Sequence, residues 1–207
     1  MTVQKRLRFK KVFLVFFCVF VALFGWQRAE ASDYDHYNPI EKDASSTGFE
    51  TLQQLNHDVC GWISLDGTKV DYPLLQSQDN VKYLDRNAFG DYTITGSIFL
   101  DYRFNPNFTD FNTIIYGHHV ENGVMFGDVA KFSDKEFFDQ HRYGSIYYNG
   151  VEKGLEIFEM LEVDAYDFNI YDPGIQGVDR QQAYLDHLLS VAMHKRDISL
   201  SPSDRII

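Results

Sequence analysis

The sequence is poor in cysteine and in basic charge. Its 207 residues include two cysteines, Cys18 and Cys60. That scarcity excludes cysteine-rich zinc sites, iron–sulfur clusters and small folds held together by several disulfides. Acidic side chains number 30 against 19 basic ones, and the formal net charge is −11. Non-specific binding to nucleic acid needs a basic surface, so we expect no nucleic-acid partner.

The composition is that of a chain with a real hydrophobic core. Hydrophobic residues make up 44% of the sequence and aromatic residues 16%, which excludes a disordered chain. The length predicts one ordinary domain with a short appendage, and such a domain needs neither a disulfide nor a structural metal to fold.

Basic charge is concentrated at the N-terminus. Residues 1–31 contain six basic side chains and one acidic, which leaves residues 32–207 with 13 basic and 29 acidic. The apolar run 12–26 follows the basic cluster directly, a pattern typical of an export signal. Two interpretations are open: a signal peptide cleaved after Ala29-Glu30-Ala31, or an uncleaved membrane anchor. Both place the acidic body outside the cytoplasm.

The exported body begins with a polar segment, residues 32–46, which we interpret as a linker. Residues 47–50 fit a capping box and predict a short helix with Phe49, Leu52 and Leu55 on one face. The next two segments, 62–65 and 69–74, are predicted to form a hairpin, because Asp66-Gly67 supplies a tight turn between them.

The rest of the body is predicted to contain short strands and a few helices. The predicted strands are 96–102, 112–116, 145–148 and 155–163, and the predicted helices are 124–132, 134–140 and 179–195. This pattern predicts a mainly β protein, a closed or nearly closed β-barrel with inserted helices.

One apolar strand carries the candidate catalytic residues. Residues 112–116 lead into Gly117, which permits a sharp departure from the strand, and then into His118 and His119. Three mechanisms compete on the residues alone. A metal could be bound by His118, His119 and Glu121. Cys60 could act as a nucleophile with a histidine, although a buried structural thiol is the better interpretation. The nucleophile could also be absent from this chain.

The region from about residue 55 to residue 132 resembles class B sortases, which are membrane-anchored cysteine transpeptidases of Gram-positive bacteria. Single blocks are weakly specific, but all of them in order are strongly specific. The matching blocks are 56–63, 71–73 with 83–84, 96–101, 115–118 and 123–126.

The resemblance implies an eight-stranded sortase barrel with inserted and N-terminal helices. It also implies cleavage of a C-terminal sorting motif in secreted proteins at a Thr–x bond, through a thioester. The acyl group then passes to an amine on cell-wall precursor or on a pilin lysine. The family's catalytic histidine follows Tyr-Gly and corresponds to His118, whereas His119 is a neighbour. No cofactor and no metal is implied.

The resemblance also gives a division of the chain. Residues 1–31 are expected to be the basic tip and membrane anchor, with 12–26 in the membrane, 32–46 the linker, and 47–207 the catalytic domain. The expected location is therefore the cell membrane, as a single-pass protein with the catalytic domain extracellular.

The sequence departs from the family at its end. The family's nucleophilic cysteine and its arginine would follow residues 201–207, which look like a turn and the first residues of a strand. Arg205 and Cys60 do not correspond to these two residues. We therefore expect a sortase truncated before its last strands and inactive in this form. Two alternatives stay open: an exported barrel that binds sorting signals without cleaving them, and a metal-dependent hydrolase using His118, His119 and Glu121.

Overall fold

A six-stranded sheet forms the centre of the molecule. The computed structural model describes residues 33–40, 47–199 and 204–207. The strand order is β4-β3-β2-β1-β5-β6, and all neighbours are antiparallel except the parallel pair β2 and β3. The strands are β1 (Val59–Leu65), β2 (Asp71–Leu75), β3 (Ile98–Leu100), β4 (Ile115–Tyr116), β5 (Tyr143–Tyr148) and β6 (Val151–Glu156).

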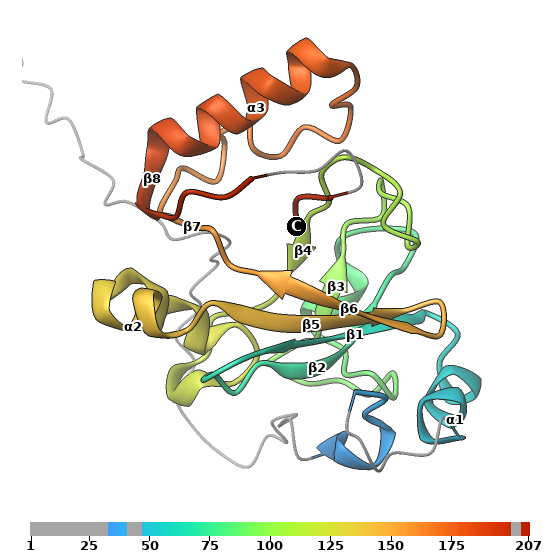
Figure 1. Cartoon of the computed structure of the whole chain (residues 1–207). Coiled ribbons are helices and arrows are strands. Elements are labelled where there is room, and N and C mark those ends of the chain that lie inside the picture. The colour runs from blue at the N-terminus through green and yellow to red at the C-terminus, as the bar shows by residue number, and fades with distance from the viewer. Residues whose placement is uncertain (1–32, 41–46, 200–203) are drawn as a thin grey trace, which may run out of the picture.

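A second layer lies to one side of this sheet. It consists of the antiparallel pair β7 (Glu159–Leu161) and β8 (Ala192–Lys195) together with helix α3 (Val178–Val191). Figure 1 shows this layer on one side of the sheet, with helix α1 (Thr47–Leu55) at the opposite end and α2 (Lys135–Gln140) beside β5. Short 3-10 helices cover Asp35–Tyr37, Lys82–Leu84, Glu121–Gly123 and Gly127–Ser133.

The predicted hairpin is confirmed as β1 and β2. Gly67 adopts a φ of 75° in the turn, a conformation that glycine reaches without steric cost. The Leu65 amide donates to the Val70 carbonyl at 2.9 Å and closes the turn. Trp62 and Leu74 are almost completely buried, so the hairpin lies at the centre of the main core.

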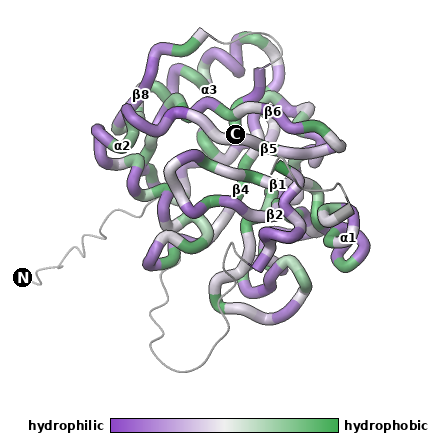
Figure 2. The backbone as a smooth tube through the Cα atoms, turned by 60° about the horizontal axis from the view of Figure 1, so that its bottom comes forward, coloured by the Kyte–Doolittle hydropathy of each residue, from purple (hydrophilic) through white to green (hydrophobic). Residues whose placement is uncertain are grey.

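The region beneath α3 has a core of its own. Along α3 the colour alternates between hydrophobic and hydrophilic, as the predicted amphipathic helix requires (Figure 2). Tyr184 and Leu188 of this helix pack with Val163, Ile170 and Ile206. This second cluster holds the α3 layer close to the end of β4.

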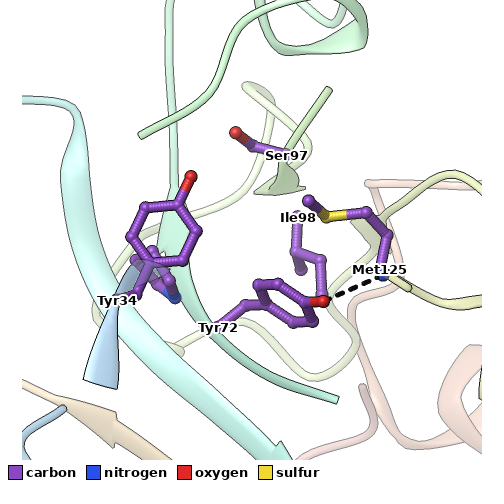
Figure 3. A pocket seen from close by; sticks show the side chains of 6 residues that line it. Tyr34, Tyr72, Ser97, Ile98 and Met125 are labelled. Carbon is purple, nitrogen blue, oxygen red and sulfur yellow. Dashed lines mark hydrogen bonds between the residues drawn. The ribbon is translucent and has the colours of Figure 1, made fainter. Parts of the chain in front are cut away.

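Residues 33–40 pack against the main core, although they belong to the predicted linker. Tyr34 is 1% exposed, and its ring lies 6.3 Å from that of Tyr72 at a steep angle. Figure 3 shows both rings beside Ile98 and Met125, around a hollow too small to hold a water molecule. Asn38 donates to both carboxylate oxygens of Asp71, at 3.1 and 3.0 Å. Residues 41–46 lie outside the described residues, and the domain boundaries stay a prediction.

Several predicted elements differ in detail. The sheet is not closed into a barrel. Residues 155–163 form parts of two strands. β6 pairs with β5 and ends at Glu156, and β7 begins at Glu159 and pairs with β8. The helix predicted over 179–195 ends at Val191, since Ala192–Lys195 are taken into β8. The helix predicted over 124–132 is the 3-10 helix Gly127–Ser133.

The structure contradicts the predicted membrane localisation. No helix among residues 33–40, 47–199 and 204–207 is both long and apolar enough to cross a bilayer, which takes about 20 apolar residues. This finding contradicts the predicted single-pass membrane anchor. The apolar run 12–26, on which the prediction depended, lies outside the described residues.

Candidate active site

His118 lies immediately beyond the end of β4, the edge strand of the main sheet. Its carbonyl accepts a hydrogen bond from the Phe126 amide at 2.9 Å, so the segment after the 3-10 helix Glu121–Gly123 holds this strand end in place. The side chain is half-buried. Burial lowers the pKa of His118 below the ordinary imidazole value. The imidazole is therefore mostly neutral at pH 7 and able to accept a proton.

Gly117 is required by close packing rather than by a turn. Its φ is not in the left-handed region, so no special backbone conformation calls for glycine here. A Cβ at this position would lie 2.7 Å from Cδ2 of Phe126. The ring of Phe126 thus packs directly on the backbone between Tyr116 and His118. The sequence-based reason for this glycine was a sharp departure from the strand, and the structure adds a different one, the contact with Phe126.

The strand end is tied to a buried carboxylate. Asp101 follows β3 and is 0% exposed. Its Oδ1 accepts from the Arg103 backbone amide and from Nε of Arg103, both at 2.9 Å. Its Oδ2 accepts from Nη2 of Arg103 at 2.6 Å and from the hydroxyl of Tyr116 at 2.8 Å. These four hydrogen bonds use the acceptor sites that a carboxylate offers.

The electrostatics of this cluster favour the ionised carboxylate. Burial acts to raise the pKa of Asp101, but hydrogen bonds from Arg103 and Tyr116 outweigh it and leave the pKa lowered. The pKa of Arg103 is raised by its hydrogen bonds to Asp101. Burial, with the hydrogen bond to Asp101, also raises the pKa of Tyr116. The cluster therefore holds a fixed ion pair and a protonated phenol across the neutral pH range.

The loop before α3 contacts the same end of the sheet. Nη2 of Arg103 also lies 3.4 Å from the carbonyl of Tyr171, and the Asn112 side chain donates to the Asp172 carbonyl at 2.9 Å. His187 of α3 bonds Asp167 at 2.9 Å on the other side of the loop. The loop is thus fixed between α3 and the strand that leads to His118.

Residues 204–207 lie beside residues 111–113, the segment that leads into β4. Ile206 pairs with Asn112 in parallel, the Ile206 amide donates to the Phe111 carbonyl, and the Thr113 amide donates to the Ile206 carbonyl, each bond at 2.9 Å. Figure 1 places this end of the chain between β4 and the α3 layer. Arg205 is exposed, and its side chain donates to the Asp204 carbonyl at 2.6 Å.

Cys60 does not meet His118. It lies on β1, three strands away from β4 in the sheet, a separation of about 14 Å. Its thiol contacts the Leu74 carbonyl at 3.4 Å, and burial raises its pKa to about 12. A thiol in this state forms almost no thiolate at pH 7, so the structure supports the interpretation of this half-buried cysteine as structural. Cys18 lies outside the described residues.

The three candidate metal ligands are not gathered into a site. His119 and Glu121 are exposed, and the backbone of His119 pairs with Met125. Within the described part of the chain, no group of three or more His, Cys, Asp or Glu side chains is placed to hold a metal ion. The sequence reasoning also missed Asp101, Arg103 and Tyr116. Asp101 and Tyr116 stood inside two of the matching blocks, but nothing local indicated that they touch.

Comparison with known proteins identifies the family of this chain. No protein-family model matches the chain. Sortase B of Listeria monocytogenes is 36% identical over 174 residues, which are 80% of this chain and 70% of that protein. Sortase B of Staphylococcus aureus is 31% identical over 159 residues, 77% of this chain and 65% of that protein.

Solved structures give the same result. A sortase B from the type II pilus of Streptococcus pneumoniae is 77% identical, with a TM-score of 0.65 over 76% of this chain and 85% of that one. A Bacillus anthracis protein similar to sortase B is 31% identical, with a TM-score of 0.74 over 85% of both chains. The fold and the relatives define a cysteine transpeptidase of the sortase type. The chain belongs to the class B sortase family.

Proposed function

We propose that His118 is the proton-transfer group of a sortase B-type transpeptidation. The observation that carries the proposal is the half-buried His118 side chain just past the end of the edge strand β4, on a backbone that a hydrogen bond from the Phe126 amide holds in place. A neutral imidazole can take the proton of a thiol and return it to an amine. Cys60 does not fit as the partner thiol, because it lies three strands away from β4 and its thiol contacts the Leu74 carbonyl.

The edge of β4 supports a partner thiol on a parallel strand. Ile206 pairs with Asn112, and residues of parallel strands advance in step. The sixth residue of a strand continuing after Ile206 would therefore lie beside His118. A cysteine there would attack the threonine carbonyl of a sorting motif, and the peptide C–N bond would break. The thiol proton passes through His118 to the leaving amine.

The second half of the reaction uses the same two groups. An incoming amine attacks the thioester carbon and passes one proton to His118, and the C–S bond breaks to release the sulfur as thiol again. We propose proteins with a C-terminal sorting motif as acyl donors, and the solved sortase B–substrate complex from Staphylococcus aureus supports a substrate site in this fold. The acceptor is an amine of cell-wall precursor or of a pilin lysine, and the relative from a type II pilus supports the pilin.

The test compares the 207-residue chain with a form extended by five residues that end in cysteine. That cysteine stands six positions after Ile206. We expect its alkylation by iodoacetamide to follow a pH profile shifted below that of a free thiol, because a neighbouring imidazole favours the thiolate. His118→Ala should remove the shift, whereas His119→Ala should preserve it.

A matched control places the cysteine one position earlier, where the side chain points to the other face of the strand. Its pH profile should be that of an ordinary thiol. Equal profiles in the two extended forms, or a shift lost only in His119→Ala, would overturn the assignment. Incubation of each form with a sorting-motif peptide and triglycine, followed by mass spectrometry, then detects thioester and product. The predicted inactivity of the 207-residue chain stays a prediction, which its own incubation tests.

A further inference from the structure

The cluster of Asp101, Arg103 and Tyr116 links three parts of the structure around His118. We propose that these residues form a positioning unit, which holds the His118 strand end and the 164–174 loop in one fixed arrangement. They act through the backbone and do not themselves react. The inference rests on the proposed role of His118, but its test below does not depend on turnover.

The first step of the argument is the cost of disturbing Asp101. Its carboxylate is completely buried and accepts four hydrogen bonds, three from Arg103 and one from Tyr116. A buried charge that loses one donor is left partly unsatisfied, which is far more costly than losing an exposed hydrogen bond. The four hydrogen bonds are therefore maintained together, and the three side chains have a single favourable arrangement.

The second step connects this arrangement to His118. The Tyr116 hydroxyl is bonded to Asp101, and the Tyr116 ring packs on the buried Phe99 with ring centres 5.3 Å apart. Tyr116 is the last residue of β4, and His118 follows it after one residue. Between them, Phe126 packs against Gly117. Fixing the phenol thus fixes the backbone from which the imidazole projects.

The third step connects the arrangement to the loop. Arg103 is the member that reaches outward, because Nη2 bonds Asp101 and also approaches the Tyr171 carbonyl at 3.4 Å. Asn112, on the segment leading into β4, holds the next carbonyl, that of Asp172. A displacement of the loop therefore disturbs the hydrogen bonds of Asp101, and through them the backbone that carries His118.

The experiment uses the full chain and follows His118 by NMR. Tyr116→Phe is the main variant, because it keeps the ring that packs on Phe99 and removes only the hydroxyl. We expect the pKa of His118, lowered by burial in the parent, to rise toward its ordinary value of about 6.5 as the strand end loosens. Amide exchange at Gly117 and His118 should become at least about tenfold faster, since a hydrogen bond to a charged group is lost.

Arg103→Lys tests the link to the loop. Lysine keeps the charge but cannot reproduce the forked contact with the carboxylate. We expect faster exchange around Tyr171 and Asp172 as well as a smaller rise in the pKa of His118. The control is Arg142→Gln, which removes a short pair with Glu156 between β5 and β6 and should leave His118 and the loop unchanged.

The outcomes distinguish a unit that positions His118 from one that only stabilises the fold. If Tyr116→Phe lowers the melting temperature without moving the pKa of His118 or the local exchange, the unit is merely structural and the inference is wrong. An equal pKa change in Arg142→Gln would also overturn it. If instead these signals move as expected while His118→Ala leaves the thiol profile of the extended form unchanged, the proposed function fails and the positioning unit stands.

Discussion

At the scale of single residues, two positions show how neighbours decide what a side chain can do. Gly117 has no Cβ because Phe126 occupies that space, and the consequence is a closely packed backbone beside His118. Glu159 of β7 has both carboxylate oxygens buried with no hydrogen-bond partner among the described residues. Neither property can be recognised from the residue alone, since each depends on what the fold brings against it.

Gly117→Ala should destabilise the protein by about 1–3 kcal/mol, because the new methyl group meets the Phe126 ring and forces it aside. Urea unfolding measures the change. Gly154→Ala is the control: a Cβ at this exposed position in β6 meets nothing within 4 Å, and its stability should be unchanged or slightly raised. Equal losses in the two variants would show that Phe126 is not the cause.

Glu159→Gln should stabilise the protein more at pH 8 than at pH 5. Desolvation raises the pKa of Glu159 to about 7, against the lowering effect of Lys195. Because the folded pKa lies above the unfolded value of about 4.5, the carboxyl contributes favourably below pH 4.5, and that contribution is lost as the pH rises through 7. The difference between the two pH values should be on the order of 1 kcal/mol after allowance for partial solvent screening.

Thermal unfolding at both pH values measures this difference. Glu121→Gln serves as the matched control, because it makes the same substitution at an exposed position. A gain for Glu159→Gln that is the same at pH 5 and pH 8 would contradict the assignment of the effect to the buried charge.

At the scale of elements, the β7–β8 pair is the part that local patterns misplaced. Ala192–Lys195 have the spacing that continues α3, and they form a strand because β7 offers a partner some 35 residues earlier. Arg196, at the end of β8, then fastens the pair to α2. Its guanidinium lies 3.8 Å from the centre of the Phe138 ring and donates to the carbonyls of Phe138, Ile157 and His141. The pairing of β8 with β7 and the contacts of Arg196 with α2 together outweigh the local helical pattern.

Arg196→Lys should weaken this attachment by about 1–3 kcal/mol, because a single ammonium cannot reach the carbonyls that the guanidinium joins. Urea unfolding gives the loss, and hydrogen exchange should show the earliest opening in α2 and β8. Lys153→Arg, a charge-conserving change at an exposed position of β6, provides the control. Uniformly faster exchange over the six-stranded sheet would contradict a local role for Arg196.

At the scale of the whole molecule, the sequence predicted local elements and, from the order of its motifs, the family. The β1–β2 hairpin followed from Asp66-Gly67, and the strand that precedes His118 followed from its apolar run before Gly117. The family was recognised from blocks whose order survives in the chain. The contacts of this cluster were not predictable. Tyr116 reaches Asp101, and the Tyr171 carbonyl reaches Arg103, only when separate strands and a distant loop meet. The open sheet likewise depends on pairings that no local pattern reveals.

The packing of residues 33–40 determines which strands would bear a mechanical force applied at the N-terminal side of the domain. Tyr34 is buried in the core, and Asn38 grips Asp71, whose carboxylate also accepts from the Trp62 indole at 2.6 Å. Asp71 opens β2, and Trp62 lies in β1, the two central strands of the sheet. Mechanical load entering through this segment is therefore spread over the middle of the sheet.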